Sequence, residues 1–430
     1  MKITIMGLGY VGLPLTLVCS QKQHQVYGFD VDKDKIESLK KGVSPIKDEI
    51  LEKEVKSSTK KVKFTNNAEE AINDSEIVIV CVPTPTDKEH KPDLSFVESA
   101  SETISKNVKK GQLVIIESTI YPGTTEEVII PILEKSGLKA GADFDVAYCP
   151  ERIDPGNKEY TIKNLPRVVG AINKEGLDRA MKFYNSIIDK KDDVTGLSSI
   201  KAAEATKIME NTFRDINIAF VNEMAKSFDK AGIDISEVIR GASTKPFGFM
   251  KHYPGCGVGG HCIPVDPYYL IEKAKQIGFE HKFLSLAREI NNSMPEYTVD
   301  LLEEELKRLG KKAEDSNVGV LGLAYKKDVD DLRESPALKI VEILENKKAS
   351  VAVFDPYINE KSNVKDIDEF LEKSDYVILA TDHSEFKGLH PDKLKSSGVK
   401  VIIDGRNCFD NGKVKEIKDA GIAYKGIGRS

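Results

Sequence analysis

Long apolar runs and one-sided blocks of charge are both missing from this sequence. No stretch reaches the roughly 18 consecutive apolar residues that a membrane-spanning helix needs, so we expect a cytosolic protein with no membrane partner. The formal net charge is -6, and lysines and acids are interleaved throughout, which leaves no basic block for a nucleic acid. The sequence therefore indicates neither a membrane protein nor a dedicated nucleic-acid binder.

Cysteine is scarce and scattered. The six cysteines form no paired framework, and in a chain of 430 residues we expect thiols rather than disulfides. A metal site is also disfavoured, because His261, Cys262 and Asp266 have no second Cys/His pair at ligand spacing nearby. We therefore expect no bound metal.

The first thirty residues carry a dinucleotide-binding pattern. The apolar stretch 2–6 predicts a strand that leads into the motif Gly7-x-Gly-x-x-Gly12, after which a helix is expected. Residues 25–30 predict a second strand that ends in an acid, Asp30. The glycines permit a tight turn and a close approach to a pyrophosphate, and the carboxylate can bind ribose hydroxyls. The acid favours NAD over NADP, although Lys33 and Lys35 nearby leave NADP open.

Two continuous apolar runs, 76–82 and 112–117, are typical of strands buried on both faces of a parallel sheet. In such a sheet, ligands bind beyond the carboxyl ends of the strands. Thr84 and Thr119, in the loops that follow, are therefore expected to face the cofactor. The alternative is that both are plain turn residues.

A further strand, which starts near 144, ends at Glu151 and Arg152. These side chains would lie at the same edge of the sheet as the two threonines, where they could meet a ligand. The alternative is a pair of solvated charges.

A long helix is expected from 198 to about 231. Lys207, Asn211 and Arg214 stand at i, i+4 and i+7, so they share one helical face and form a strip of hydrogen-bond donors. A solvated face is the alternative, but such a face usually mixes in acids. A second helical stretch, 282–309, is interrupted near Pro295 and could form a spine between two domains.

The last third of the sequence repeats the first. Four apolar stretches match the earlier strands in type and order, at 317–325, 350–356, 374–382 and 399–404. The first turn of this repeat lacks the third glycine and carries Lys326, Lys327 and Arg333 instead. Such a turn suits a nucleotide held by side-chain cations.

These patterns predict an α/β protein in which two Rossmann-like doubly wound domains are joined by a central helical domain with a long spine helix. The chain is too long for a single core. We expect the NAD-binding domain over 1–196, the helical domain over 197–312 and the second Rossmann-like domain over 313–430.

A glycine-rich loop leads to Cys262. Four glycines lie between Gly255 and Gly260, so the backbone can adopt positive φ and admit a ligand closely. Pro264 and Pro267 stiffen the exit of the loop. A thiol at this position is placed like a nucleophile, and the alternative is a buried structural cysteine in a tight turn.

An NAD domain and a thiol together predict a particular reaction. A hydride acceptor alone oxidises an alcohol to an aldehyde. A Cys262 thiolate can capture that aldehyde as a thiohemiacetal, a second hydride transfer gives a thioester, and water releases a carboxylate. Lys207 and Asn211 could stabilise the oxyanions, and Asp266 could orient Lys207 or a water. We expect four-electron oxidation of a primary alcohol on a nucleotide-bearing substrate.

Six motifs together resemble the UDP-glucose/GDP-mannose dehydrogenase family over essentially the whole chain. The motifs are Gly7-Leu-Gly-Tyr-Val-Gly-Leu-Pro14, Val82-Pro-Thr-Pro85, Pro150-Glu-Arg152, Lys207-x-x-x-Asn211, Gly259-Gly-His-Cys262 with Asp266, and Lys326 with Asp331-Leu-Arg-Glu-Ser-Pro336. The resemblance implies catalysis by Cys262 as nucleophile and Lys207 as proton donor or acceptor. Asn211, Asp266 and Glu151 would be the supporting catalytic groups.

The same resemblance implies the binding residues and the assembly. The implied NAD contacts are Gly7, Gly9, Tyr10, Val11, Gly12, Asp30, Lys35, Thr84, Thr119 and Arg333. The implied contacts to a UDP-sugar substrate are Arg152, Ile153, Lys207, Asn211, Arg214, Gly259, Tyr325, Lys326 and Arg406. Family members are similar in forming homodimers through the central helix, with each subunit lending residues to its neighbour's site.

Three stretches of the sequence indicate which sugar the substrate carries. UDP-glucose members usually carry Ser-Cys-Phe-Pro-Lys-Asp where this chain has His261-Cys-Ile-Pro-Val-Asp266, which resembles the branch acting on N-acetylated hexosamines. Glu151-Arg-Ile-Asp-Pro-Gly156 and Lys245-Pro-Phe-Gly-Phe-Met250 look more like the UDP-N-acetylglucosamine 6-dehydrogenases. UDP-N-acetylmannosamine and then UDP-glucose are the alternative substrates, and the uronic acid product would enter polysaccharide biosynthesis.

Two hypotheses from other classes remain open. A two-electron dehydrogenase of the hydroxyacid type would share the NAD domain but would not need Cys262. A non-catalytic NAD sensor would keep only the glycine fingerprint.

Overall fold

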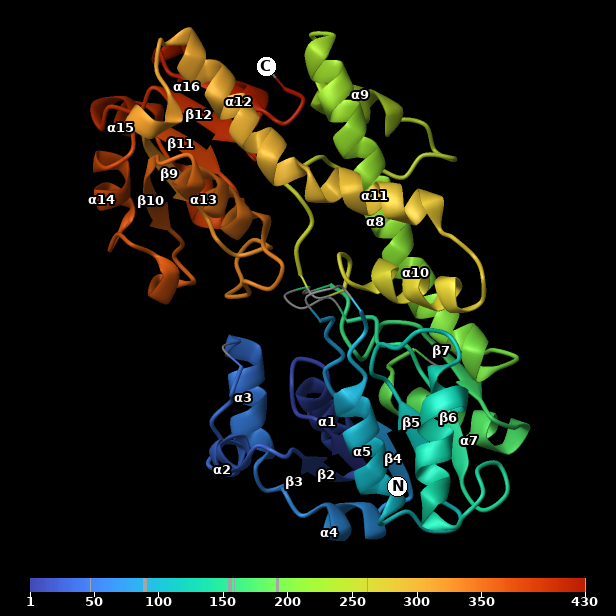
Figure 1. The fold of residues 1–430 in the computed structure, drawn as a ribbon. Coiled ribbons are helices and arrows are strands. Elements are labelled where there is room, and N and C mark those ends of the chain that lie inside the picture. The colour runs from blue at the N-terminus through green and yellow to red at the C-terminus, as the bar shows by residue number, and fades with distance from the viewer. Residues whose placement is uncertain are drawn as a thin grey trace. The chain divides into compact units, whose positions relative to one another are not determined.

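The computed structural model describes residues 1–46, 48–87, 91–153, 157, 159–190, 193–260 and 262–429. The chain forms two compact units, each with its own sheet and core (Figure 1). The N-terminal unit comprises residues 1–210 and 268–279, and the C-terminal unit comprises 211–267 and 280–430. The expected division into three domains stays a prediction.

The sheet of the N-terminal unit has the strand order β3-β2-β1-β4-β5-β6-β7-β8. Its strands are β1 (Lys2–Met6), β2 (Gln25–Phe29), β3 (Val62–Thr65), β4 (Ile77–Val80), β5 (Leu113–Ile116), β6 (Asp145–Tyr148), β7 (Arg167–Ala171) and β8 (Val194–Gly196). Neighbours pair in parallel except for β6 and β7, which are antiparallel. The order reverses between β1 and β4, and the crevice beyond these strand ends is where dinucleotides bind in such sheets.

Helices cover both faces of this sheet, as the continuous apolar runs predict. They are α1 (Gly12–Gln21), α2 (Lys33–Lys40), α3 (Glu49–Ser58), α4 (Ala68–Asn73), α5 (Ser95–Ser105), η1 (Thr125–Ile129), α6 (Ile130–Leu133), η2 (Glu134–Ser136) and α7 (Lys174–Ile187). Ile77 and Ile79 of β4 pack in a cluster with α1 and α7, whereas Val78 and Val80 pack in a cluster with α5 and α6. Alternate residues of the strand therefore serve opposite faces.

Five further helices follow, namely α8 (Ile200–Lys230), α9 (Ile235–Ala242), α10 (Asp266–Gln276), α11 (Lys282–Asn292) and α12 (Met294–Arg308). The predicted long helix is confirmed as α8. The predicted interruption is confirmed at Ser293, between α11 and α12. Pro295 stands in the first turn of α12, where its missing N–H costs no hydrogen bond.

The sheet of the C-terminal unit is entirely parallel, with the order β10-β9-β11-β12-β13. Its strands are β9 (Asn317–Leu321), β10 (Ser350–Phe354), β11 (Tyr376–Leu379), β12 (Val401–Asp404) and β13 (Ala423–Gly426). Its helices are η3 (Ala313–Asp315), α13 (Pro336–Asn346), η4 (Asn359–Lys361), α14 (Ile367–Glu372), η5 (Ser384–Gly388), α15 (Pro391–Ser396) and α16 (Asn411–Asp419). The predicted α/β class with a second Rossmann-like sheet is confirmed.

In the part of the chain that the structure describes, no helix combines the length and the apolar character that crossing a membrane requires.

Candidate functional site

The three glycines of the first turn are required for three different reasons. Gly7 has φ +93°, and a Cβ there would lie 2.6 Å from the carbonyl oxygen of Cys81. A Cβ on Gly12 would lie 1.8 Å from the carbonyl oxygen of Gly7, so α1 can start against the turn only with glycine. A Cβ on Gly9 would meet no described atom within 4 Å. Gly9 thus offers an open backbone at the start of α1, which fits the pyrophosphate of a dinucleotide.

Asp30 follows β2 and is buried. Its carboxylate accepts hydrogen bonds from the backbone N–H groups of Leu8 at 2.9 Å and Asp32 at 3.0 Å, and from Lys35 Nζ at 2.7 Å. Burial alone would raise the pKa of Asp30, but the bonds from Lys35 and the two N–H groups outweigh burial and lower it. Asp30 is therefore held ionised, as ribose recognition requires, and Lys35 is its ion-pair partner.

The remaining residues predicted for NAD in this unit lie in turns at strand and helix ends. Tyr10 is exposed, and Val11 is the residue before α1. Thr84, after β4, is buried, and its carbonyl oxygen accepts a hydrogen bond from the Tyr269 hydroxyl at 2.7 Å. Thr119, after β5, is half-buried. The turn after β1 and the loops after β4 and β5 therefore bring their residues to one edge of the sheet.

Glu151 and Lys207 contact each other at this edge. The Lys207 ammonium donates to the carbonyl oxygen of Glu151 at 2.5 Å. The Glu151 carboxylate accepts from the backbone N–H groups of Arg152 at 2.6 Å and Ile153 at 2.5 Å. Lys207 is only 7% exposed, so helix α8 presents it to the protein rather than to solvent. The predicted strip of donors therefore does not form a solvated face at Lys207.

Arg152 is held by a residue that the sequence reasoning missed. Its guanidinium forms an ion pair with Glu210 of α8 and also donates to the carbonyl oxygen of Pro166 at 3.0 Å. The sequence does point to Glu210, because it stands three residues after Lys207 and is an acid within the predicted strip of donors.

A second missed group is the buried cluster of Glu117, Arg167 and Tyr184. Glu117 directly follows β5, and its carboxylate lies 3.5 Å from Arg167 and accepts from the Tyr184 hydroxyl at 2.5 Å. Burial raises the pKa of Glu117 to about 7, Arg167 opposes the rise, and the neighbouring Glu151 adds to it. The only sequence signal was an acid at the end of an apolar run, and its partners lie far away in the chain.

In the C-terminal unit the glycine-rich loop packs on the turn after β9. Gly257 and Gly260 have φ +137° and +88°, as the predicted positive φ requires. A Cβ on Gly259 would lie 2.6 Å from Cβ of Tyr325, and one on Gly257 would lie 2.9 Å from Cβ of Pro336. The close approach that these glycines permit is therefore made by the chain's own side chains.

Cys262, Asp266 and Asn211 form one connected group. Among the six cysteines, all of which are described, Cys262 is the exposed one. The N–H of Asp266 donates to the carbonyl oxygen of Cys262 at 2.9 Å, and the Asn211 amide donates to the Asp266 carboxylate at 2.5 Å. An exposed thiol is accessible to a substrate, which a buried structural cysteine is not. His261 and residues 154–156 lie outside the described residues.

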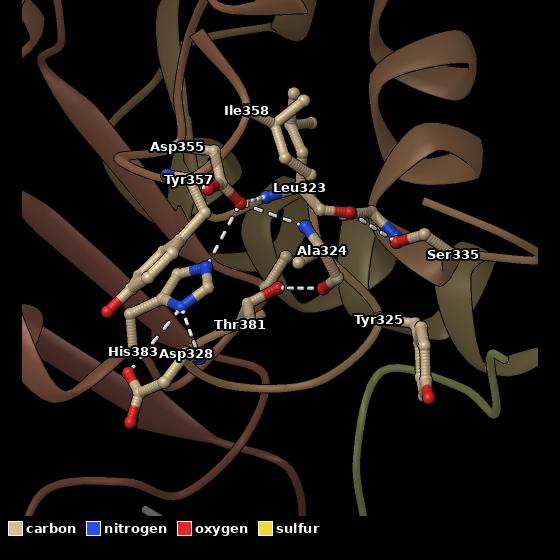
Figure 2. Close-up of polar contacts among 12 residues, drawn as sticks. Leu323, Ala324, Tyr325, Asp328, Ser335, Asp355, Tyr357, Ile358, Thr381 and His383 are labelled. Atoms are coloured by element: carbon tan, nitrogen blue, oxygen red, sulfur yellow. Dashed lines mark hydrogen bonds and ion pairs between the residues drawn. The ribbon is translucent and has the colours of Figure 1, made fainter. Parts of the chain in front are cut away.

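Figure 2 shows how the turn after β9 is held. Asp355, which follows β10 as Asp30 follows β2, accepts from the N–H groups of Leu323 at 2.6 Å and Ala324 at 2.9 Å. Thr381 donates to the carbonyl oxygen of Ala324 at 2.5 Å, and the Tyr325 side chain points away from this cluster (Figure 2). The turn is thus fixed by side chains that follow β10 and β11, namely Asp355 and Thr381.

His383 links Asp355 to the far end of the same turn. Its Nδ1 accepts from the backbone N–H of Asp328 at 2.8 Å, so its Nε2 donates to Asp355 at 3.0 Å. The Tyr357 ring stacks on His383 with 4.8 Å between ring centroids. Burial alone would raise the pKa of Asp355, but hydrogen bonds from His383 and the turn lower it. The acid that would bind ribose in a dinucleotide site is here engaged by its own turn.

The predicted cations of this unit lie around Tyr325. Arg406 donates to the carbonyl oxygens of Tyr325 at 2.7 Å and Ala380 at 3.1 Å. Arg333 pairs with Asp331 at 2.6 Å, and its carbonyl oxygen accepts from the N–H of Gly260 at 2.9 Å. Lys326 is half-buried, and Arg214 is exposed on α8. The structure therefore gathers Gly259, Tyr325, Lys326, Arg333 and Arg406 around one turn.

Models of the UDP-glucose/GDP-mannose dehydrogenase family match the chain in three consecutive parts. The NAD binding domain matches residues 1–188, the central domain 201–293 and the UDP binding domain 319–411.

Individual proteins match over nearly the whole chain. A UDP-N-acetyl-D-mannosamine dehydrogenase from Pyrococcus horikoshii is 38% identical, with 100% of this chain and 99% of the relative covered. A UDP-N-acetyl-D-glucosamine 6-dehydrogenase from Pseudomonas aeruginosa is also 38% identical, with 96% and 98% covered. A solved structure of a UDP-D-ManNAc dehydrogenase from Pyrococcus horikoshii superposes with a TM-score of 0.92 at 38% identity, covering 100% of this chain and 99% of that one.

Proposed function

The chain belongs to the UDP-glucose/GDP-mannose dehydrogenase family, and from this premise we propose that it oxidises C6 of a UDP-N-acetylhexosamine to the uronic acid. It is an NAD-dependent oxidoreductase of that family. UDP-N-acetylglucosamine is the preferred substrate, and the product serves polysaccharide biosynthesis. The observation that carries the proposal is the exposed Cys262, whose loop is tied through Asp266 to Asn211 of α8.

Cys262 turns a two-electron reaction into a four-electron one. When bound, NAD supplies the hydride acceptor for each of the two oxidations. The Cys262 thiolate adds to the C6 aldehyde and forms a carbon–sulfur bond, which gives a thiohemiacetal. Loss of a hydride from C6 converts this into a thioester, and attack of water breaks the carbon–sulfur bond and returns the thiol. The sugar leaves as a carboxylate.

Lys207 and Asn211 stand one helical turn apart on α8, and we assign to them the charge that develops on the C6 oxygen. Lys207 gives and takes the proton of that oxygen, while Asn211 donates a hydrogen bond. Glu151 supports Lys207 through the contact to its carbonyl oxygen, and Asp266 supports Asn211. The alternative, that these residues form a solvated helix face with no role in the reaction, is disfavoured by the burial of Lys207.

The nucleotide sugar is assigned to the cations and the turn that the structure gathers in the C-terminal unit. Arg406 and Lys326 lie at a turn that Asp355 and His383 hold rigid, so they need little ordering when the diphosphate binds. The further substrate contacts are Arg152, Ile153, Arg214, Gly259 and Tyr325. The NAD contacts are Gly7, Gly9, Tyr10, Val11, Gly12, Asp30, Lys35, Thr84, Thr119 and Arg333.

The chain also forms a homodimer through α8. Phe213 and Phe220 stand seven residues apart on this helix and are 47% and 56% exposed, so they form an apolar stripe on one face. An exposed apolar stripe on a long helix is typical of a helix-to-helix interface.

The test of the proposed activity is a comparison of kcat/KM for UDP-N-acetylglucosamine, UDP-N-acetylmannosamine and UDP-glucose with NAD. We expect the glucosamine substrate to rank first, UDP-glucose to rank last, and the product to be a uronic acid by mass spectrometry. A higher kcat/KM for the mannosamine substrate would move the assignment to the alternative epimer. A product that stops at the aldehyde would favour a two-electron dehydrogenase.

A further inference from the structure

Arg167, the first residue of β7, is buried between two carboxylates. Its side chain is 2% exposed, and its guanidinium lies 3.5 Å from Glu117 and 3.5 Å from Glu151. The Tyr184 hydroxyl donates to the same Glu117 oxygen that faces Arg167, and the centroid of the Tyr184 ring lies 5.1 Å from the guanidinium carbon. A charge this deeply buried is tolerated only where it is paired, so the cluster fixes the position of each member.

The cluster contacts Lys207, the residue assigned to proton transfer, through Glu151. One oxygen of Glu151 faces Arg167, and the other accepts from the N–H groups of Arg152 and Ile153. The carbonyl oxygen of the same Glu151 receives the Lys207 ammonium at 2.5 Å. A shift of the Glu151 carboxylate would therefore move the peptide groups of 151–153 and the acceptor that holds Lys207.

A purely structural ion pair is the competing explanation. Buried ion pairs contribute little net stability, because desolvation offsets their attraction. The two contacts are also long for ion pairs that would add much stability, since both N–O distances are 3.5 Å and one guanidinium serves two acids. The location argues for a role in the reaction, because Glu117 and Glu151 follow the adjacent strands β5 and β6 at the ligand-binding edge.

We propose that Arg167 is a positioning residue for the oxidation, which holds the Glu151 carboxylate and thereby keeps Lys207 in the geometry that proton transfer needs. Glu117 and Tyr184 also contact the guanidinium and help to hold it in place. The inference rests on the proposed function, because it assigns Arg167 a part in the same reaction.

A double-mutant cycle tests this role. Arg167→Lys keeps the charge but cannot bridge two carboxylates, so we expect kcat to fall about tenfold or more while both KM values change less than about threefold. In the Glu151→Gln background the same change should lower kcat further by less than about twofold, because the group it positions is already altered. A similar fall of kcat in both backgrounds would overturn the proposal.

The matched control is Arg179→Lys on α7. Arg179 pairs with Asp145 at 2.6 Å, in the same unit, and has no contact to Glu151 among the described residues. We expect kcat to stay within about twofold of the wild type in this variant. A fall equal to that of Arg167→Lys would assign the effect to general destabilisation and would also overturn the proposal.

If Arg167→Lys does not fold, Glu117→Gln carries the test, since glutamine keeps the shape and still accepts from Tyr184. At about pH 8, above the pKa of Glu117, this variant removes one of the two negative charges that face Arg167. We expect a loss of kcat that disappears in the Glu151→Gln background. An unchanged kcat would overturn the proposal. Failure of the proposed function is distinguishable, because the wild-type chain would then form no NADH with any of the three UDP sugars.

Discussion

Asp30 and Glu117 are both buried acids just beyond strands of the same sheet, yet their pKa values move in opposite directions. Asp30 receives hydrogen bonds from two backbone N–H groups and from Lys35, which outweigh burial and lower its pKa. Glu117 shares Arg167 with a second carboxylate, so burial dominates and raises its pKa to about 7. Burial and the neighbouring Glu151 carboxylate raise the pKa of Glu117, whereas the three donors that contact Asp30 lower its pKa.

The raised pKa of Glu117 predicts a pH-dependent stability. Between the ordinary value of 4.5 and about 7, the folded chain keeps a proton on Glu117 that the unfolded chain releases, so the free energy of unfolding falls as pH rises through this window. Glu117→Gln has no such proton. We expect the stability of the wild type, relative to this variant, to decrease between about pH 5 and about pH 8, measured as urea midpoints. A constant or increasing difference would contradict the assignment.

Asp355, which follows β10, is also served by several donors, and it holds the turn after β9. Its two oxygens accept from Leu323, Ala324, His383 and the N–H of Tyr357 (Figure 2). An Asp355→Asn variant would turn an NH2 group toward these donors and loosen the turn that carries Tyr325 and Lys326. We expect affinity for UDP to fall about tenfold and affinity for NAD to stay unchanged, both by calorimetry.

The control for this variant is Asp366→Asn. Asp366 is the residue before α14, and its carboxylate accepts from the N–H groups of Asp368 and Glu369. Asparagine serves that position equally well, so neither affinity should change. A UDP affinity for Asp355→Asn equal to that of the control would show that the turn does not depend on Asp355.

We predict that the exposed apolar stripe on helix α8 forms the dimer interface. Phe220→Glu places a charge on the exposed apolar stripe, which we expect to convert a dimer into a monomer in light scattering. Phe96→Glu on α5 is the matched control, because Phe96 is 49% exposed and lies in another helix. Dimers that survive Phe220→Glu would place the interface elsewhere.

At the scale of the whole molecule, the sequence predicted best where a strand is an unbroken apolar run, and this held even for the edge strand β10. The strands β4 and β5 were predicted because they are buried on both faces and read as unbroken apolar runs. The edge strands β3, β8 and β13 and the inner strand β7 were not predicted, because their residues do not form an unbroken buried run, as the alternation of half-buried and buried residues in Ala423–Gly426 illustrates.

The residues of the candidate site fall into two groups, those that lie in a local sequence motif and those that only the fold brings together. Gly7, Asp30 and Cys262 lie in local motifs, so they could be predicted as site residues from the sequence alone. Arg167 contacts acids that stand 50 and 16 residues earlier in the chain, and no local pattern reports such a contact. Only the fold brings β5, β6 and β7 side by side.

We propose that Cys262 makes the oxidation a four-electron one. The most direct test is the amount of NADH formed per molecule of limiting UDP-N-acetylglucosamine, for the wild type and for Cys262→Ala. Cys408→Ala, which removes a half-buried thiol in the loop after β12 of the same unit, serves as the control.

We predict about two NADH per sugar for the wild type and for Cys408→Ala, and no more than about one for Cys262→Ala, because the second oxidation requires the thiohemiacetal. About one NADH per sugar in the wild type, or about two in Cys262→Ala, would contradict the thioester route.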